Sequence, residues 1–82
     1  MRVMVRLTGR YKNLIGLEST IVDTINGDTV WHVIDALVEK YQVLGKDKNR
    51  MIILRNGVHV NREEKIKNND ELTILPPVVS GG

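Results

Sequence analysis

The chain has 82 residues, no cysteine, and a formal net charge of +2 from 12 basic and 10 acidic residues. This length allows one domain with a small core, and the missing thiols exclude disulfides, cysteine nucleophiles and thiolate metal sites. The two signs of charge are interspersed, so no basic face points to nucleic acid as a partner. Because no apolar run approaches the roughly 20 residues of a membrane span, we expect a cytoplasmic protein without membrane contact.

Two strands are predicted in the first third of the chain. Residues 2–7 carry an aliphatic side chain at every second position, which is the pattern of a half-buried strand. Residues 11–16 interrupt this pattern and are predicted to form a loop anchored by Leu14 and Ile15. Residues 19–25 are rich in β-branched side chains, which favour a strand. The two strands are therefore expected to pair as a hairpin with a long connection.

One amphipathic helix is predicted at residues 30–41. Its apolar residues recur at spacings of three and four, which places them on one face of a helix. These residues are Val30, Val33, Ile34, Leu37, Val38 and Tyr41. Asp28 or Thr29 is the expected N-cap, since either side chain can accept a hydrogen bond from a free amide of the first turn. Such a helix needs a sheet face on which to bury its apolar side.

A hairpin is predicted after a charged loop at residues 44–50. Residues 51–55 and 58–60 flank Asn56-Gly57, the preferred pair for the two-residue turn between antiparallel strands. The expected partners across the hairpin are Arg55 with Val58 and Ile53 with Val60. The nearly continuous apolar character of the first strand indicates that it lies well inside the sheet.

The last strand is predicted at residues 71–75. It follows a turn at residues 68–70, where asparagine tolerates left-handed backbone conformations. It stops at Pro76-Pro77, because proline cannot donate a hydrogen bond to the ladder. The predicted element order is β-β-α-β-β-β. We therefore expect an α+β domain over residues 1–75, in which one helix covers a mixed sheet of four to five strands.

Residues 76–82 show no pattern of a further element and are predicted to form a flexible C-terminal tail. Extended, this segment reaches at most roughly 23–25 Å, enough to carry a terminal carboxylate into another protein. Pro76 and Pro77 would stiffen the base of the arm. Gly81 and Gly82 leave the last carbonyl carbon open to a nucleophile, which suits a carboxylate that is activated as an acyl-adenylate. The candidate reactive group is the Gly82 carboxylate.

The element order, the Asn56-Gly57 turn and residues 72–82 resemble those of the MoaD/ThiS family of sulfur carriers, which have the ubiquitin-like β-grasp fold. The likeness is sharpest to the MoaD-type members, the small subunits of molybdopterin synthase, whose tails typically read Pro-Pro-Val-Ser-Gly-Gly or similar. This chain differs by one extra valine, Val78 or Val79, before Ser80, and that valine lengthens the arm.

The resemblance implies a non-catalytic carrier with no bound cofactor. An E1-like adenylyltransferase, similar to MoeB, would use ATP to adenylate Gly82, and a persulfide sulfur would displace AMP and leave a thiocarboxylate. The carrier would then donate sulfur in molybdopterin, and hence molybdenum cofactor, biosynthesis by inserting its tail into a MoaE-like large subunit. Gly81, which has no side chain, would give the tail clearance inside the partner enzyme. The threading arm would comprise Pro76, Pro77, Val78, Val79 and Ser80.

Other functions for the same tail stay open. An activated Gly82 carboxylate also serves a ubiquitin-like modifier that forms isopeptide bonds with target-protein lysines. Carriers of this shape serve thiamin and tRNA thiolation as well, so the sulfur acceptor is not identified. A plain binding module with an incidental tail would need a basic or aromatic face, which the sequence does not show.

An independent enzyme is not expected, because the sequence has no Ser/His/Asp arrangement and no Gly-rich phosphate loop. His32 and His59 are its two histidines, and neither lies in a cluster with a recognised metal-ligand spacing. We therefore expect no metal site. His32 is expected on the solvated face of the helix, and Trp31 at the edge of the core.

Overall fold

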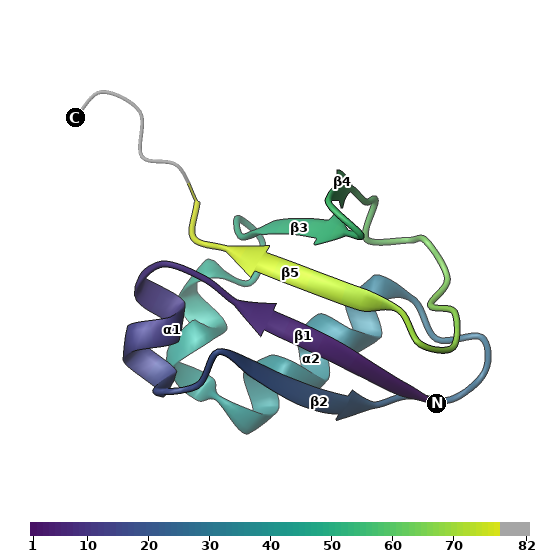
Figure 1. Ribbon diagram of the computed structural model, residues 1–82, viewed down its shortest axis with the longest axis horizontal. Helices are drawn as coiled ribbons and strands as arrows, with labels where there is room; N and C mark the ends of the chain where they lie inside the picture. The colour runs from purple at the N-terminus through teal and green to yellow at the C-terminus, as the bar shows by residue number, and fades with distance from the viewer. Residues whose placement is uncertain (78–82) are drawn as a thin grey trace.

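The computed structural model describes residues 1–77, which form a five-stranded sheet with a helix across one face (Figure 1). The strands are β1 (Arg2–Leu7), β2 (Ser19–Asp23), β3 (Ile52–Arg55), β4 (Val58–His59) and β5 (Glu71–Leu75). The helices are α1 (Arg10–Ile15), α2 (Val30–Lys40) and the 3-10 helix η1 (Gln42–Asp47). The sheet order is β2-β1-β5-β3-β4, so the last strand lies in the middle of the sheet.

The central strand β5 joins two hairpins. β1 and β2 pair antiparallel, as do β3 and β4. β5 runs parallel to β1 on one side and antiparallel to β3 on the other. The sheet is therefore mixed, as predicted, and the interior place of β3 is confirmed. The five strands and α2 follow one another along the chain in the predicted order. Because β5 is flanked on both sides, its C-terminal end is held in position by two neighbours.

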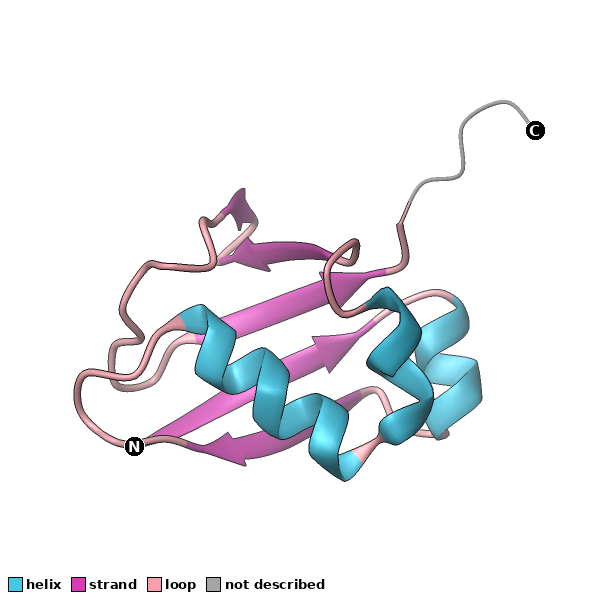
Figure 2. Ribbon diagram, turned by 180° about the vertical axis from the view of Figure 1, so that it is seen from behind, coloured by secondary structure: helices cyan, strands magenta, loops and turns pink. Residues whose placement is uncertain are grey.

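The core lies between the sheet and α2 (Figure 2). It is built mainly from the inward side chains of β1 and β5 and from the apolar face of α2: Val3, Val5, Leu7, Val30, Val33, Ile34, Leu37, Leu72 and Ile74. The predicted apolar face of the helix is confirmed, with Val38 and Tyr41 partly buried at its end. Each fully buried aliphatic side chain stabilises the fold by roughly 1.5–3 kcal/mol.

Thr29 is the N-cap of α2, as one of the two candidates predicted. The His32 amide donates to the Thr29 side chain, and the Thr29 amide donates to His32 Nδ1 at 2.9 Å. His32 therefore takes the place that glutamate or glutamine usually has in such a reciprocal cap. Its ring is exposed, as predicted, but it also satisfies a backbone donor of the helix start.

The predicted turns have the backbone geometry that their residues favour. Asn56 and Gly57 have φ values of 50° and 82°, both positive, as a two-residue hairpin turn requires. Arg55 pairs with Val58, which confirms the predicted register. The Val60 amide donates to the Ile53 carbonyl oxygen at 3.3 Å in the same register.

The loop predicted at residues 11–16 is wrong, because α1 occupies Arg10–Ile15. Its buried anchor is Tyr11, whereas Leu14, one of the two expected anchors, is exposed. Gly16 ends the helix in the left-handed region, with its amide bonded to the Lys12 carbonyl oxygen at 2.8 Å. A helix this short depends on tertiary contacts and shows no helical period in the sequence.

The charged loop predicted at residues 44–50 is wrong over its first part, because η1 occupies Gln42–Asp47. This short helix buries Leu44 and Asp47. The second strand is shorter than predicted and ends at Asp23, although the Thr24 amide still bonds to the first residue of the chain.

Candidate functional site at the start of the tail

The tail begins at a point of the sheet that is fixed from both sides. Leu75 pairs with Ile52 in the ladder between β5 and β3. Ile74 pairs with Leu7 of β1. Just after β1, the Thr8 Oγ1 hydroxyl donates a hydrogen bond of 3.0 Å to the Ile74 carbonyl oxygen. The chain therefore leaves the sheet from an anchored position.

Gly9 lies against the first residue of the predicted tail. Its backbone has φ 57° and ψ −135°, a conformation that residues with a side chain rarely adopt. A Cβ atom on Gly9 would lie 3.6 Å from both Cγ and Cδ of Pro76, which is ordinary van der Waals distance. The turn from β1 into α1 thus lies close to Pro76, and Thr8 holds Ile74 near the end of β5.

A buried carboxylate holds α1 against η1 and thereby fixes this turn. The Asp47 side chain is only 3% exposed. Its Oδ2 accepts hydrogen bonds from the Tyr11 hydroxyl at 2.8 Å and from Arg10 Nη2 at 2.9 Å. Arg50 Nη2 lies 3.4 Å from Oδ1. Because Arg10 directly follows Gly9, the network positions the turn that lies close to Pro76.

Hydrogen bonding and burial shift the pKa of two groups in this network. The hydrogen bond from Tyr11 is the main cause that lowers the pKa of Asp47; Arg10 adds to it, and burial opposes both. Burial, followed by the hydrogen bond to Asp47, raises the pKa of Tyr11 to about 12. Asp47 is therefore ionised and Tyr11 neutral near pH 7, and both serve to hold structure.

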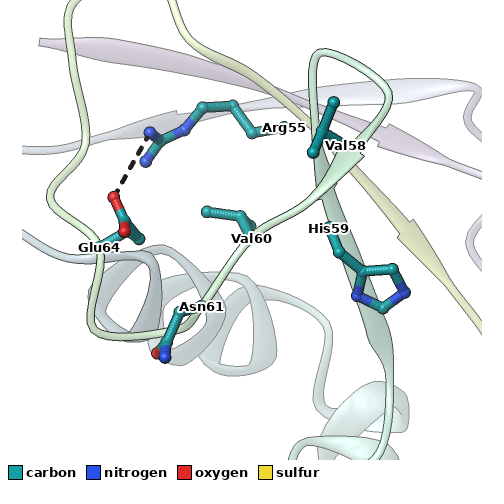
Figure 3. A pocket seen from close by; sticks show the side chains of 6 residues that line it. All are labelled: Arg55, Val58, His59, Val60, Asn61 and Glu64. Carbon is teal, nitrogen blue, oxygen red and sulfur yellow. Dashed lines mark ion pairs between the residues drawn. The ribbon is translucent and has the colours of Figure 1, made fainter.

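A shallow pocket of about 250 Å³ lies beside the turn between β3 and β4 (Figure 3). Its lining residues are Arg55, Val58, His59, Val60, Asn61 and Glu64. Arg55 faces Glu64 at 3.9 Å and Asp70 at 3.4 Å, so its charge is already balanced within the chain. Arg55 also pairs with Leu72, toward the end of β5 away from the tail. The pocket is therefore separate from the tail.

Within residues 1–77, no three His, Asp or Glu side chains are grouped so that they could hold a metal ion. None of the helices in that range is long and apolar enough to cross a membrane.

Comparison with protein families assigns the chain to one family. The model of the ThiS family matches residues 5–82. The chain belongs to the ThiS family. This result confirms the predicted membership of the MoaD/ThiS group of ubiquitin-like sulfur carriers. A comparison with curated proteins found no match.

Solved structures share the fold of this ThiS family member over its whole length. SAMP1 from Haloferax volcanii is 30% identical, with a TM-score of 0.84 over 100% of both chains. Small archaeal modifier protein 1 from Methanosarcina acetivorans is 29% identical, with a TM-score of 0.78 over 99% of this chain and 96% of that chain. A putative molybdopterin converting factor subunit 1 from Pyrococcus furiosus is 21% identical, with a TM-score of 0.84 over 95% and 99%. The predicted ubiquitin-like β-grasp fold is confirmed.

The structure describes only the start of the predicted tail. Pro76 and Pro77 follow β5 and are partly buried. The other residues assigned to the tail site lie outside the described residues, and their roles stay predictions: Val78, Val79, Ser80, Gly81 and Gly82. The sequence reasoning missed Thr8, Gly9 and Asp47 as residues that support the tail. The glycines on either side of α1 were the available signal for a short capped helix there.

Proposed function

We propose that this ThiS family member is a sulfur carrier whose Gly82 carboxylate is converted to a thiocarboxylate. In this proposal it donates sulfur in molybdopterin biosynthesis as the non-catalytic small subunit of molybdopterin synthase. The observation that carries the proposal is the family match over residues 5–82, which includes the predicted tail. The hydrogen bond from Thr8 to Ile74 agrees with it, because the chain leaves the sheet toward the tail from an anchored position.

The proposed chemistry takes place at Gly82, inside partner enzymes. On an E1-like, MoeB-like enzyme, a Gly82 carboxylate oxygen attacks the α-phosphorus of ATP, and pyrophosphate leaves. The terminal sulfur of an enzyme persulfide then attacks the acyl carbon, and AMP leaves. A thiol reduces the resulting acyl disulfide and releases the thiocarboxylate. Gly81 and Gly82 place no side chain next to this carbon, which keeps it accessible.

The acceptor in this proposal is a MoaE-like large subunit. A structure of similar fold contains subunits 1 and 2 of the molybdopterin-converting factor from Helicobacter pylori as a protein-protein complex; its matched chain is 23% identical to this one, with a TM-score of 0.67. Residues 76–80 would form the arm that reaches into the large subunit. Thiamin and tRNA thiolation would use the same thiocarboxylate. Binding of this chain to a MoaE-like subunit would therefore distinguish a role in molybdopterin biosynthesis from these two alternatives.

Deletion of Gly81 and Gly82 tests the proposal. The truncated chain should keep the thermal unfolding midpoint of the full chain, because the described domain ends before these residues. It should no longer support ATP–pyrophosphate exchange by the E1-like enzyme, because the terminal carboxylate then belongs to Ser80 and lies two residues short of the position that is adenylated. Ser80→Ala is the matched control, which alters the tail but keeps both glycines and should keep exchange. Undiminished exchange with the truncated chain would refute the proposal.

A role as a protein modifier is the second candidate. The small archaeal modifier proteins compared are 28–30% identical to this chain. The two molybdopterin converting factor structures and a BexX/CysO complex from Amycolatopsis orientalis are 21–23% identical. In that role the adenylated Gly82 would pass to the amine of a target lysine. Lys67 is the last basic residue of the sequence, so trypsin would leave residues 68–82 on each modified lysine. Such branched peptides from conjugates that survive reductant and denaturant would establish the modifier role.

A further inference from the structure

The two edges of the sheet differ in how well they are protected. β4, at one edge, comprises only Val58–His59, and a strand this short offers little to a second chain. β2, at the other edge, comprises Ser19–Asp23 and pairs with β1 in continuous register without a bulge. It contains no proline or lysine, which commonly guard an exposed edge. Among the described strands, β2 is therefore the edge open to pairing.

Two backbone hydrogen bonds show which groups of β2 face away from the sheet. The Leu7 amide donates to the Glu18 carbonyl oxygen at 2.8 Å, and the Thr24 amide donates to the Met1 carbonyl oxygen at 2.7 Å. These bonds bracket the ladder between β1 and β2. Hydrogen-bonded and non-hydrogen-bonded pairs alternate along an antiparallel ladder, so the bracketing bonds determine the alternation in between.

The alternation gives β2 an outward-facing set of backbone groups. Thr20 and Val22 bond to β1, and their side chains are buried. The intervening residues direct their N–H and C=O groups away from β1: Ser19, Ile21 and Asp23. Their side chains are exposed on the face of the sheet opposite α2.

Apolar side chains mark the same edge. Ile21, in the middle of β2, is 45% exposed and lies beside Met4 of β1, which is 38% exposed. Leu17 precedes the strand with 45% exposure, and Ile25 follows it with 72% exposure. Leu17 and Ile25 are equally distant from Ile21 along the chain, so the apolar pattern is symmetric about Ile21.

We propose that β2 pairs antiparallel with β2 of a second copy of this chain, about a two-fold axis at Ile21. In this register Ile21 lies opposite Ile21 of the second copy, and Ser19 lies opposite Asp23. The outward N–H and C=O groups of all three residues then exchange hydrogen bonds. Leu17 meets Ile25 at either end, and no like charges lie directly opposite each other. The two sheets become one continuous sheet.

A second copy suits this edge because its apolar positions lie opposite one another about an axis at Ile21, whereas an axis one residue to either side places apolar side chains opposite polar ones. A two-fold axis at Thr20 would place Leu17 opposite Asp23. An axis at Val22 would place Ser19 opposite Ile25. β1 separates β2 from β5, so the pairing leaves the tail free and does not depend on the proposed carrier function.

Sedimentation velocity of the full chain over a range of protein concentrations tests the pairing. We expect a monomer–dimer equilibrium. Ile21→Lys places like charges opposite each other on the axis and should raise the dissociation constant at least about tenfold. Val58→Lys is the matched control, because Val58 is an exposed apolar residue of the other edge strand. A chain that is monomeric at all concentrations, or an Ile21→Lys variant that dimerises like wild type, would overturn the proposal.

Amide hydrogen exchange of the unmodified chain tests the register and needs no variant to fold. The amides of Ser19, Ile21 and Asp23 should gain protection as the concentration rises, whereas those of Thr20 and Val22 should be protected at every concentration. A dimer in which the first three amides exchange as fast as in the monomer would place the interface elsewhere and contradict the proposal. If the chain stays monomeric and these amides gain protection only after a cell extract is added, another protein binds the β2 edge. That result would also contradict the proposal.

Discussion

Asp47 is a buried, ionised residue that holds together the part of the molecule next to the tail. A carboxylate is stable at such a site only where hydrogen bonds and opposite charge replace water. Tyr11 and Arg10 supply both from α1, and Arg50 lies close on the other side. The result is a link from η1 through α1 to the Gly9 turn, which lies close to Pro76.

Tyr11→Phe should reduce the loss of stability at alkaline pH. The pKa of Tyr11 is raised from 10.0 to about 12, so its contribution to stability is complete below pH 10 and is lost as the pH rises through about 12. The variant should lose about 1–3 kcal/mol of unfolding free energy near pH 7, because Asp47 loses a hydrogen bond. Its remaining stability should fall less at alkaline pH. Urea unfolding across this pH range measures both effects.

Tyr41→Phe is the control for this titration, since Tyr41 is the other tyrosine and its hydroxyl lies 3.3 Å from Thr20 Oγ1 and not near Asp47. This variant should keep the alkaline decline of the wild-type chain. Equal declines in the Tyr11→Phe variant and in wild type would show that the buried hydroxyl is not the group responsible.

The turn between β1 and α1 lies next to the start of the tail, and Gly9→Ala tests whether its backbone is strained for a residue with a side chain. The backbone at Gly9 is strained for alanine, so the substitution should cost about 1–3 kcal/mol of unfolding free energy, measured by urea unfolding. Gly45→Ala is the matched control in η1, where the new Cβ would lie 3.5 Å from Val38 Cγ1. It should leave stability unchanged or raise it by up to about 1 kcal/mol. Equal effects of the two substitutions would exclude strain at Gly9.

The elements predictable from the sequence are those with repeated local signals. The alternation in β1, the apolar face of α2 and the Asn56-Gly57 turn each place several residues of one kind at a fixed spacing. α1 and η1 escaped prediction because each buries few residues, and because Asp47 is a charged residue that would ordinarily be solvated. The hydrogen bond from Thr8 to Ile74 and the approach of Gly9 to Pro76 join distant parts of the chain, so no local sequence pattern predicts them.

At the scale of the whole molecule, the sheet order separates two surfaces. The tail starts from the central strand β5, and the open edge lies at β2. The two proposals are therefore compatible, because activation of Gly82 and pairing at β2 would use different parts of the chain. The family match over residues 5–82 supports the tail as the reactive part, whereas the strand pattern of β2 alone supports the second contact.

The central claim is that Gly82 becomes a thiocarboxylate. The most direct test is the intact mass of the full chain after incubation with ATP, an E1-like enzyme from the same source and a sulfur donor. We predict a mass increase equal to the replacement of one oxygen by sulfur, located at Gly82 by fragmentation. No increase, with the same enzyme shown to be active on another carrier, would contradict this proposal and leave a modifier or a plain binding module as the remaining functions.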